Sequence, residues 1–170
     1  MDLNEFIRDV ADFPVDGVVF KDICPLLQNT AAFRYAVNAM VEQVSELDVD
    51  VIAAPDARGF IFGVPMALAL NLPFVPIRKS GKLPYQTSSF SYELEYGSDT
   101  LEMHVDAIQM GQHVLLVDDL LATGGTIAAC GSLVEQQGGI IAGYSFLIEL
   151  EFLSGREKLA NAEIHRLLSY

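Results

Sequence analysis

Two adjacent acids and a pair of glycines lie close together in the stretch 113–130, HVLLVDDLLATGGTIAAC. The apolar run 114–117 predicts a buried strand, and Asp118 and Asp119 follow it directly. A short turn then precedes a segment with helical spacing of its apolar residues. Ligands of open parallel sheets bind beyond the carboxyl ends of the strands, so these acids and the turn occupy positions suited to a ligand.

The turn 122–126 has the residue types of a phosphate cradle. Gly124 and Gly125 let backbone N–H groups converge, while the hydroxyls of Thr123 and Thr126 add donors. The start of the following helix contributes its dipole, which favours an anion. The two acids before the turn would repel a phosphate, but they suit the hydroxyls of a ribose. The stretch therefore predicts a site for ribose 5′-phosphate.

Two better-known phosphate motifs are excluded by the residues of this turn. A Walker A loop needs Gly-Lys-Ser/Thr, and no lysine is present; the dinucleotide motif G-x-G-x-x-G is also absent. The remaining alternative is that the acids merely end a strand and the glycines merely turn the chain. Paired acids beside apolar strands are costly without partners, so we favour the ligand site.

The charge of the chain narrows the classes of partner. There are 23 acidic residues against 10 basic ones, a formal charge of −13, which argues against a nucleic-acid surface. Arg78, Lys79 and Lys82 place three of those ten bases within the sequence RKSGK. In so acidic a chain this cluster predicts binding of a small anion, and a solvated loop is the alternative.

Size and composition favour one domain spanning residues 1–170. The chain is 51% hydrophobic with a mean hydropathy of +0.32, enough for a substantial core. No apolar run reaches the ~18 residues of a membrane span, and the acidic, amphipathic N-terminus lacks the zones of a signal peptide. We therefore expect a cytoplasmic protein with no membrane partner, in which Cys24 and Cys130 are reduced thiols.

Strands alternating with helices predict an α/β protein with a parallel sheet covered on both faces. The expected strands span residues 49–55, 73–77, 114–117 and 140–148. The expected helices span residues 2–11, 30–47, 59–70 and 125–137, and either Asn29 or Thr30 caps the second.

An inserted hairpin is expected at about residues 80–105. Apolar and polar residues alternate over 89–96, which predicts a half-exposed strand. With Gly97-Ser98-Asp99 as the turn, this strand can pair with 100–105, and the preceding GKLPYQTSS has the composition of a mobile loop. Such a hairpin is a candidate flap. From alternation alone, Glu95 within it is more simply a solvated strand residue.

Several motifs together carry a resemblance to a known family. LLVDDLLATGGT resembles the phosphoribosyl pyrophosphate motif of the type I phosphoribosyltransferases. FPVDGVVFKDICPLL, PDARGFIFG, IRKSGKLP, YELEYG and LSGREKL resemble the adenine-specific branch of that family, in consistent order over nearly the whole chain. The resemblance implies the type I phosphoribosyltransferase fold, with a central, mainly parallel sheet flanked by helices and an inserted antiparallel flap hairpin.

The resemblance also implies an activity and its partners. Phosphoribose would pass from 5-phosphoribosyl 1-pyrophosphate to N9 of adenine, giving AMP and pyrophosphate for purine salvage. Mg²⁺ would be required and held mainly through the substrate rather than by protein side chains. The expected assembly is a homodimer.

Site residues follow from the resemblance position by position. Ribose hydroxyls and the 5′-phosphate would be held by Asp118, Asp119, Ala122, Thr123, Gly124, Gly125 and Thr126. Pyrophosphate would be met by Arg58, Arg78, Lys79 and Lys82, some of them reaching across the dimer. Glu95 matches the catalytic glutamate of the flap, and adenine would contact Val19, Phe20 and Lys21. A non-proline cis peptide is expected in the Asp56-Ala57-Arg58 turn.

The sequence argues against two other classes of protein. VLLVDD also opens receiver domains, but these need a later phospho-acceptor aspartate and no Asp follows Asp119. A DNA-binding regulator with a phosphoribosyltransferase fold needs a basic module, for which this acidic chain has no room. Residues with weaker claims on chemistry are His104, His113 and His165, which are scattered, Cys130, which suits packing, and Tyr85 and Tyr96, which either cover a ligand or anchor the flap.

Overall fold

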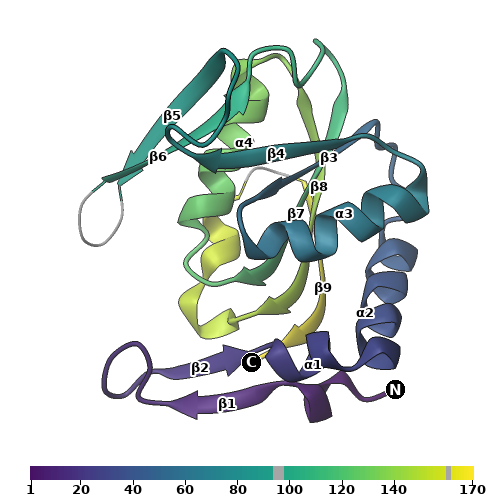
Figure 1. Ribbon diagram of the computed structural model, residues 1–170, viewed down its shortest axis with the longest axis vertical. Helices are drawn as coiled ribbons and strands as arrows, with labels where there is room; N and C mark the ends of the chain where they lie inside the picture. The colour runs from purple at the N-terminus through teal and green to yellow at the C-terminus, as the bar shows by residue number, and fades with distance from the viewer. Residues whose placement is uncertain (94–97, 160–161) are drawn as a thin grey trace.

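Two sheets organise the residues that the computed structural model describes, 1–93, 98–159 and 162–170. The larger sheet has seven strands in the order β5-β6-β4-β3-β7-β8-β9, and the smaller pairs β1 with β2 (Figure 1). Five strands of the larger sheet run parallel: β3 (Val51–Pro55), β4 (Phe74–Lys79), β7 (His113–Leu121), β8 (Ile140–Glu149) and β9 (Glu163–Ser169). Every residue of β3 is buried, as a strand covered on both faces requires.

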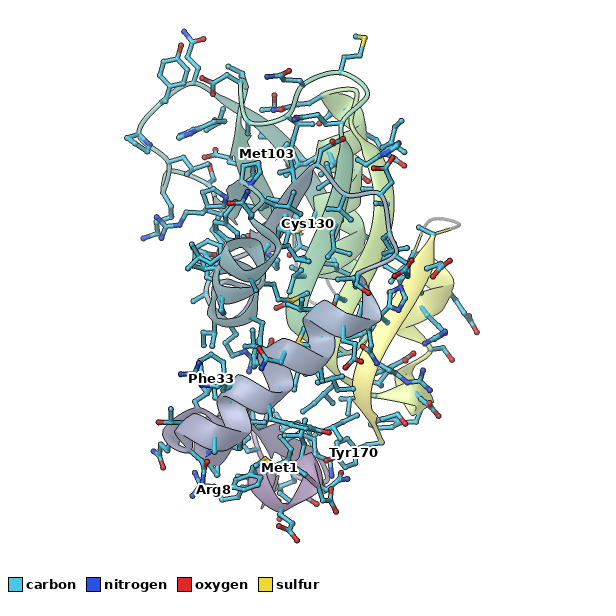
Figure 2. All side chains as sticks on the ribbon, turned by 90° about the vertical axis from the view of Figure 1, so that its right-hand side faces the viewer. Met1, Arg8, Phe33, Met103, Cys130 and Tyr170 are labelled. Carbon is cyan, nitrogen blue, oxygen red and sulfur yellow. The ribbon has the colours of Figure 1, made fainter. Side chains whose placement is uncertain are left out.

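Helices cover both faces of this sheet. α2 (Thr30–Gln43) and α3 (Arg58–Leu70) share a core cluster with Ile52, Leu115 and Leu147. α4 (Gly125–Gln136) packs on the other face with alternate residues of the same strands, and Cys130 in α4 is fully buried near the middle of the molecule (Figure 2). The expected α/β architecture with a mainly parallel sheet is confirmed.

Local sequence explains where these helices begin and how they pack. Asn29 caps α2, since its side-chain oxygen accepts from the N–H groups of Ala31 and Ala32, and the short α1 (Cys24–Gln28) precedes it. Phe33 of α2 meets Phe62 of α3 edge to face at 5.7 Å. α2 ends at Gln43, four residues before the predicted end.

The order of the strands creates a crevice between β3 and β7. β3 continues through α3 to β4 on one side, whereas β7 continues through α4 to β8 on the other, so the direction of winding reverses between them. β7 pairs with β3 only as far as Leu116, but it pairs with β8 as far as Leu121. The five residues after Leu116 therefore have an open side, at the point where open sheets bind ligands.

This geometry corrects the predicted strand 114–117. Asp118 and Asp119 do not follow the strand; they lie inside β7, in the part that has separated from β3. Pairing with β8 carries the strand on to Leu121, which the apolar run alone did not indicate.

The prediction of a helix over residues 2–11 is wrong. A 3₁₀ turn (η1, Leu3–Phe6) is followed by strand β1 (Arg8–Ala11), which pairs antiparallel with β2 (Val19–Asp22). Arg8 Nε donates to Asp22 Oδ2 at 3.0 Å across this pair. Cross-strand pairing overrides the helical spacing of the segment. Strand β9 was likewise not predicted.

The hairpin of β5 (Thr87–Glu93) and β6 (Ser98–His104) is present and extends the large sheet. β6 pairs with the edge of β4 through Arg78 and Glu102. Glu93 is opposite Ser98, so Ser98 and Asp99 belong to β6 rather than to the predicted turn. The connection, residues 94–97, lies outside the described residues.

Both hairpins project to the same side of the molecule, β1–β2 from one end and β5–β6 from the other (Figure 1). The two ends of the chain meet near the first hairpin, where the Tyr170 hydroxyl donates to Asn4 Oδ1 at 2.8 Å. Across residues 1–93, 98–159 and 162–170, no helix is long and apolar enough to cross a membrane.

Candidate active site

A cavity of about 410 Å³ opens at the carboxyl ends of β3 and β7. The turn after β3, the end of β7, the start of α4 and the β5–β6 hairpin all contribute to its wall. Its lining comprises Pro55, Asp56, Ala57, Arg58, Lys79, Tyr92, Asp99, Leu101 and all residues from Asp118 to Ile127. The structure thus brings together the acid pair, the Gly-Gly turn and two of the predicted cations.

The turn 122–126, called here the phosphate loop, joins β7 to α4. Gly124 has φ +78°, a left-handed conformation that favours glycine, and α4 begins at the next residue. The first N–H groups of a helix have no acceptor within it, and no side chain among the described residues caps this one. Thr126 Oγ1 lies 3.3 Å from the Tyr92 hydroxyl of the hairpin. The loop can therefore present several donors to one anion.

The acid pair is held by few but specific contacts. Asp118 Oδ1 accepts from the N–H of Asp119 at 2.8 Å, and Asp119 Oδ2 lies 3.0 Å from Arg58 Nε. Only 3% of Asp119 is exposed. Burial raises the pKa of both carboxyls; the charge of Asp119 raises that of Asp118 further, while Arg58 partly offsets the rise at Asp119. Both groups therefore lack the solvation of ordinary carboxylates and are available to a ligand.

Gly59 allows the start of α3 to approach the acids. A Cβ on Gly59 would lie 3.1 Å from Asp118 Oδ1 and from Val117 O, and 3.0 Å from Pro55 Cδ. The positive end of the α3 dipole consequently lies beside Asp118. The peptide bond Asp56–Ala57, just before this helix, is cis, as the family resemblance implies.

The four predicted pyrophosphate-binding cations separate into two pairs. Arg58 and Lys79 line the cavity. Consecutive residues of a strand point to opposite faces, so Arg78 turns away from Lys79 and donates to Asp56 Oδ2 at 3.0 Å and to the carbonyl of Lys82 at 3.1 Å. Lys82 is exposed and outside the lining of the cavity.

Lys79 is tied to the hairpin. Its Nζ lies 2.8 Å from Asp99 Oδ2 on β6. Hydrogen bonding to Asp99 raises the pKa of Lys79, and the same bond lowers the pKa of Asp99. The cation is thus kept charged at the wall of the cavity.

The predicted adenine contacts lie on β2, and one of them, Phe20, approaches Arg58 of the cavity wall. The Arg58 guanidinium carbon lies 5.8 Å from the centre of the Phe20 ring, within cation–π range. Phe13 meets the same ring edge-on at 5.3 Å. Lys21 points away, since its Nζ lies 2.7 Å from Asp9 Oδ1, so its main chain alone remains for a ligand. Val19 is half-exposed.

Glu95, the predicted catalytic residue, lies outside the described residues, as does Tyr96. Sequence reasoning missed Asp56, Tyr92 and Asp99 as cavity residues. Tyr92 shares its strand face with Phe90, and this alternation alone indicates a half-exposed strand and no ligand contact; the sequence predicts a turn at Asp99.

Comparison with known proteins shows the family to which the chain is similar. Residues 26–149 match the model of the phosphoribosyl transferase domain family. The adenine phosphoribosyltransferase of Desulfitobacterium hafniense is 55% identical over 170 residues, covering 100% of this chain and 98% of its own. The structure resembles that of the adenine phosphoribosyltransferase of Thermoanaerobacter pseudethanolicus with a TM-score of 0.94, at 48% identity and with 99% and 98% of the two chains covered.

A third relative has ligands in its structure. The adenine phosphoribosyltransferase of Saccharomyces cerevisiae, solved with D-2,5-dideoxy-2,5-imino-altritol 1,6-bisphosphate and adenine, matches with a TM-score of 0.89 and 42% identity over 95% of this chain and 94% of its own.

Asp118→Asn should stabilise the fold at neutral pH. Below the ordinary value of 3.8 both folded and unfolded states hold the proton. As pH rises above that value the unfolded state ionises first, because the folded pKa is raised, and stability falls by ~1.4 kcal/mol per pH unit until the folded group also ionises. The side chain of asparagine does not ionise, so the variant keeps the stability that the wild type loses as the pH rises.

Thermal unfolding of both proteins between pH 4 and pH 8 tests this expectation. The variant should melt at the higher temperature at pH 7, with the difference shrinking toward pH 4. Asp106→Asn, at an exposed position, serves as the control and should change the melting temperature little. A lower melting temperature for Asp118→Asn at pH 7 would contradict the assignment of a strained buried acid.

Proposed function

The chain belongs to the adenine phosphoribosyltransferases of the type I phosphoribosyltransferase family, and we infer that it transfers phosphoribose from 5-phosphoribosyl 1-pyrophosphate to N9 of adenine. The products are AMP and pyrophosphate, so the enzyme is a pentosyltransferase of purine salvage. The observation that carries this conclusion is the presence of the buried acid pair and the phosphate loop in one cavity at the reversal of the sheet.

The ribose 5-phosphate part of the substrate fits that cavity in one orientation, with its phosphate at the phosphate loop and its ribose at the acid pair. We propose that the 5′-phosphate accepts hydrogen bonds from the phosphate loop, where N–H groups at the start of α4 and two threonine hydroxyls converge. The ribose hydroxyls then donate to Asp118 and Asp119, whose desolvated carboxylates gain further hydrogen-bond partners.

The pyrophosphate part needs positive charge, which Arg58 and Lys79 supply at the cavity wall. Each is paired with an acid of the site and would exchange that partner for a phosphate oxygen. Arg78 and Lys82 lie outside the lining, so we propose that they act on the neighbouring site of a homodimer.

Mg²⁺ fits this site as a companion of the substrate. Of the described residues, no three His, Cys, Asp or Glu side chains are grouped to hold a metal, whereas the ion commonly binds through one or two carboxylates and substrate phosphates. Asp118 and Asp119 are the carboxylates that could face it. When bound, Mg²⁺ neutralises negative charge on the departing pyrophosphate.

The chain's own residues act on a transition state in which the C1′–O bond breaks and the ribose becomes cationic. Arg58 and Lys79 stabilise the negative charge that gathers on the leaving group. Water would hydrolyse the cation, so the β5–β6 hairpin, already in contact with Thr126 through Tyr92, is proposed to exclude it. Glu95 is proposed to manage the proton on the purine ring.

Adenine should be preferred over hypoxanthine, guanine and xanthine by at least about a hundredfold in kcat/KM, equivalent to ~2.7 kcal/mol. Adenine presents an N6 donor and an N1 acceptor, which backbone C=O and N–H groups around Val19–Lys21 can match without charge. A 6-oxopurine places an acceptor there, and no Lys or Arg lies between Lys82 and Arg156 to meet it. Each mismatched buried polar group costs ~1–3 kcal/mol.

Pyrophosphate release measured with 5-phosphoribosyl 1-pyrophosphate, Mg²⁺ and each purine base in turn tests this preference. Omission of the base gives the background hydrolysis. Comparable turnover of hypoxanthine or guanine would refute the adenine assignment while leaving the phosphoribosyl site intact.

Glu95→Gln should lower kcat far more than it raises KM, because the carboxylate acts on the transition state rather than on ground-state binding. Steady-state kinetics with both substrates varied would separate the two constants. Glu46→Gln, an exposed position just after α2, is the matched control. A Glu95→Gln enzyme as fast as the wild type would make Glu95 a surface residue.

A further inference from the structure

The back of the phosphate loop lies directly on another backbone segment, residues 151–158. This segment follows β8 and consists of two 3₁₀ turns, η2 (Glu151–Leu153) and η3 (Gly155–Lys158). A Cβ on Gly124 would lie 2.3 Å from Gly155 O, and a Cβ on Gly155 would lie 2.1 Å from Ala122 O. Neither glycine can carry a side chain without moving the other backbone, so the loop and residue 155 are in contact with nothing between them.

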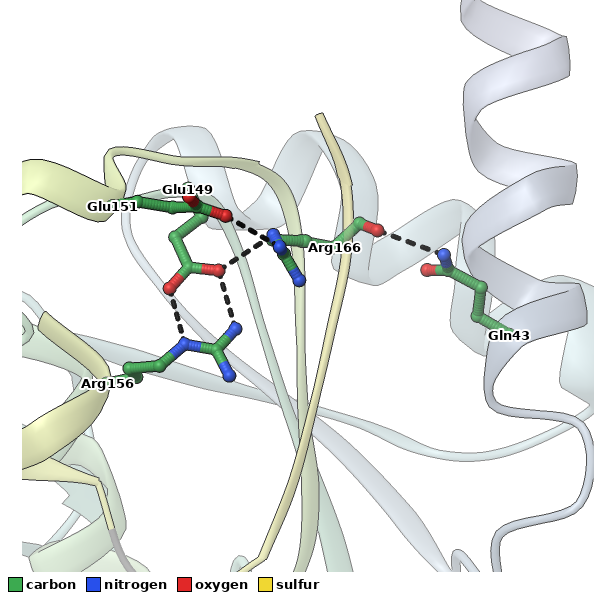
Figure 3. A network of polar contacts seen from close by, with 5 residues as sticks. All are labelled: Gln43, Glu149, Glu151, Arg156 and Arg166. Atoms are coloured by element: carbon green, nitrogen blue, oxygen red, sulfur yellow. Dashed lines mark hydrogen bonds and ion pairs between the residues drawn. The ribbon is translucent and has the colours of Figure 1, made fainter. Parts of the chain in front are cut away.

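An ion pair next to this contact holds the segment. Arg156 Nε donates to Glu149 Oε1 at 2.6 Å and its Nη2 donates to Glu149 Oε2 at 2.6 Å, a two-pronged arrangement (Figure 3). Only 2% of Glu149 is exposed. The pair therefore fixes the residue that immediately follows Gly155.

Glu149 is itself fixed to the strand that leads into the phosphate loop. It is the last residue of β8 and lies opposite Leu121, the last residue of β7. The N–H of Leu150 donates to the carbonyl of Leu121 at 2.9 Å, and the N–H of Tyr170 donates to the carbonyl of Glu149 at 3.0 Å. The anchor of Arg156 and the start of the loop thus share one rigid pair of strands.

We propose that Glu149 and Arg156 are positioning residues for the 5′-phosphate, acting through the backbone of Gly155. The pair sets how far residue 155 is pressed against the loop, and this sets the direction of the loop's N–H groups. This inference rests on the proposed function, because it assigns the bound group to the 5′-phosphate of ribose. A displacement of ~1 Å in such a support can cost as much as a hundredfold in activity.

Arg166 offers a matched control from the opposite side of the same carboxylate. Its Nε lies 3.0 Å from Glu149 Oε2 and its Nη2 donates to Glu151 Oε1 at 2.6 Å (Figure 3). It belongs to β9 and is not next to Gly155 in the chain. Loss of the Arg166 contact removes charge pairing from Glu149 without releasing residue 155 from the loop.

The test compares Arg156→Lys with Arg166→Lys. Lysine keeps the charge but cannot make the two-pronged contact. Calorimetry gives the Kd of adenosine and the Kd of AMP for each protein, and the ratio of the adenosine value to the AMP value isolates the contribution of the 5′-phosphate. We expect Arg156→Lys to reduce this ratio by about tenfold, within the range that ~1 Å of misplacement produces. Arg166→Lys should keep it within about twofold of the wild type.

Gly155→Ala provides a second variant that keeps the ion pair and pushes on the loop directly. It too should reduce the ratio of the two dissociation constants, and KM for 5-phosphoribosyl 1-pyrophosphate should rise more than kcat falls in both variants. A general loss of structure would weaken AMP and adenosine alike, leaving the ratio unchanged.

An unchanged ratio in Arg156→Lys and Gly155→Ala, or an equal drop in Arg166→Lys, would overturn the positioning role. The proposed function is judged separately, by the wild type: an enzyme that makes no AMP from adenine contradicts that function. An enzyme that does so while both variants keep the wild-type ratio contradicts only the inference about Glu149 and Arg156.

Discussion

The structure depends on two adjacent carboxylates within the central parallel strand of the sheet, Asp119 buried and Asp118 partly buried. Removing such groups from water is expensive unless partners replace the solvent. The described residues supply part of the replacement, namely Arg58, backbone N–H groups of Asp119 and Leu120, and the start of α3. The remaining hydrogen-bonding capacity points into a cavity, and the hydroxyls of a ribose are suited to use it. We propose that this burial costs stability in β7 and favours binding of the ligand.

The surrounding elements arrange the rest of the site around that strand. β7 separates from β3 after Leu116, which opens space beside the acids, and its continued pairing with β8 carries the chain to the phosphate loop. Gly59 lets α3 approach from one side, while Gly124 and Gly155 let two backbones meet behind the loop. The groups proposed to contact ribose and phosphate therefore lie at the ends of rigid strands and helices, and the β5–β6 hairpin borders the cavity.

Sequence reasoning succeeded where a signal is local. The apolar runs predicted β3 and β8, the pair Asn29-Thr30 predicted the start of α2, and residue types alone placed Asp118, Asp119 and the phosphate loop at one site. The predictions were wrong where contacts between distant residues determine the secondary structure. Arg8–Ala11 is a strand because it pairs with β2, and Asp99 belongs to β6 because that strand begins at Ser98, opposite Glu93. The pairing of Glu149 with Arg156 joins a strand end to a 3₁₀ turn, and no spacing rule predicts it. The separation of Arg78 from Lys79 follows from strand alternation, but only once β4 is known to reach Lys79.

The central claim is that the buried acid pair binds the ribose of 5-phosphoribosyl 1-pyrophosphate. Calorimetric titration of this substrate with Mg²⁺ into the wild type and into the double variant Asp118→Asn, Asp119→Asn measures it most directly. Each lost charge-assisted hydrogen bond is worth ~1.5–3 kcal/mol, so the double variant, which loses two, should bind at least about a hundredfold more weakly. Equal affinity of the two folded proteins would contradict the account.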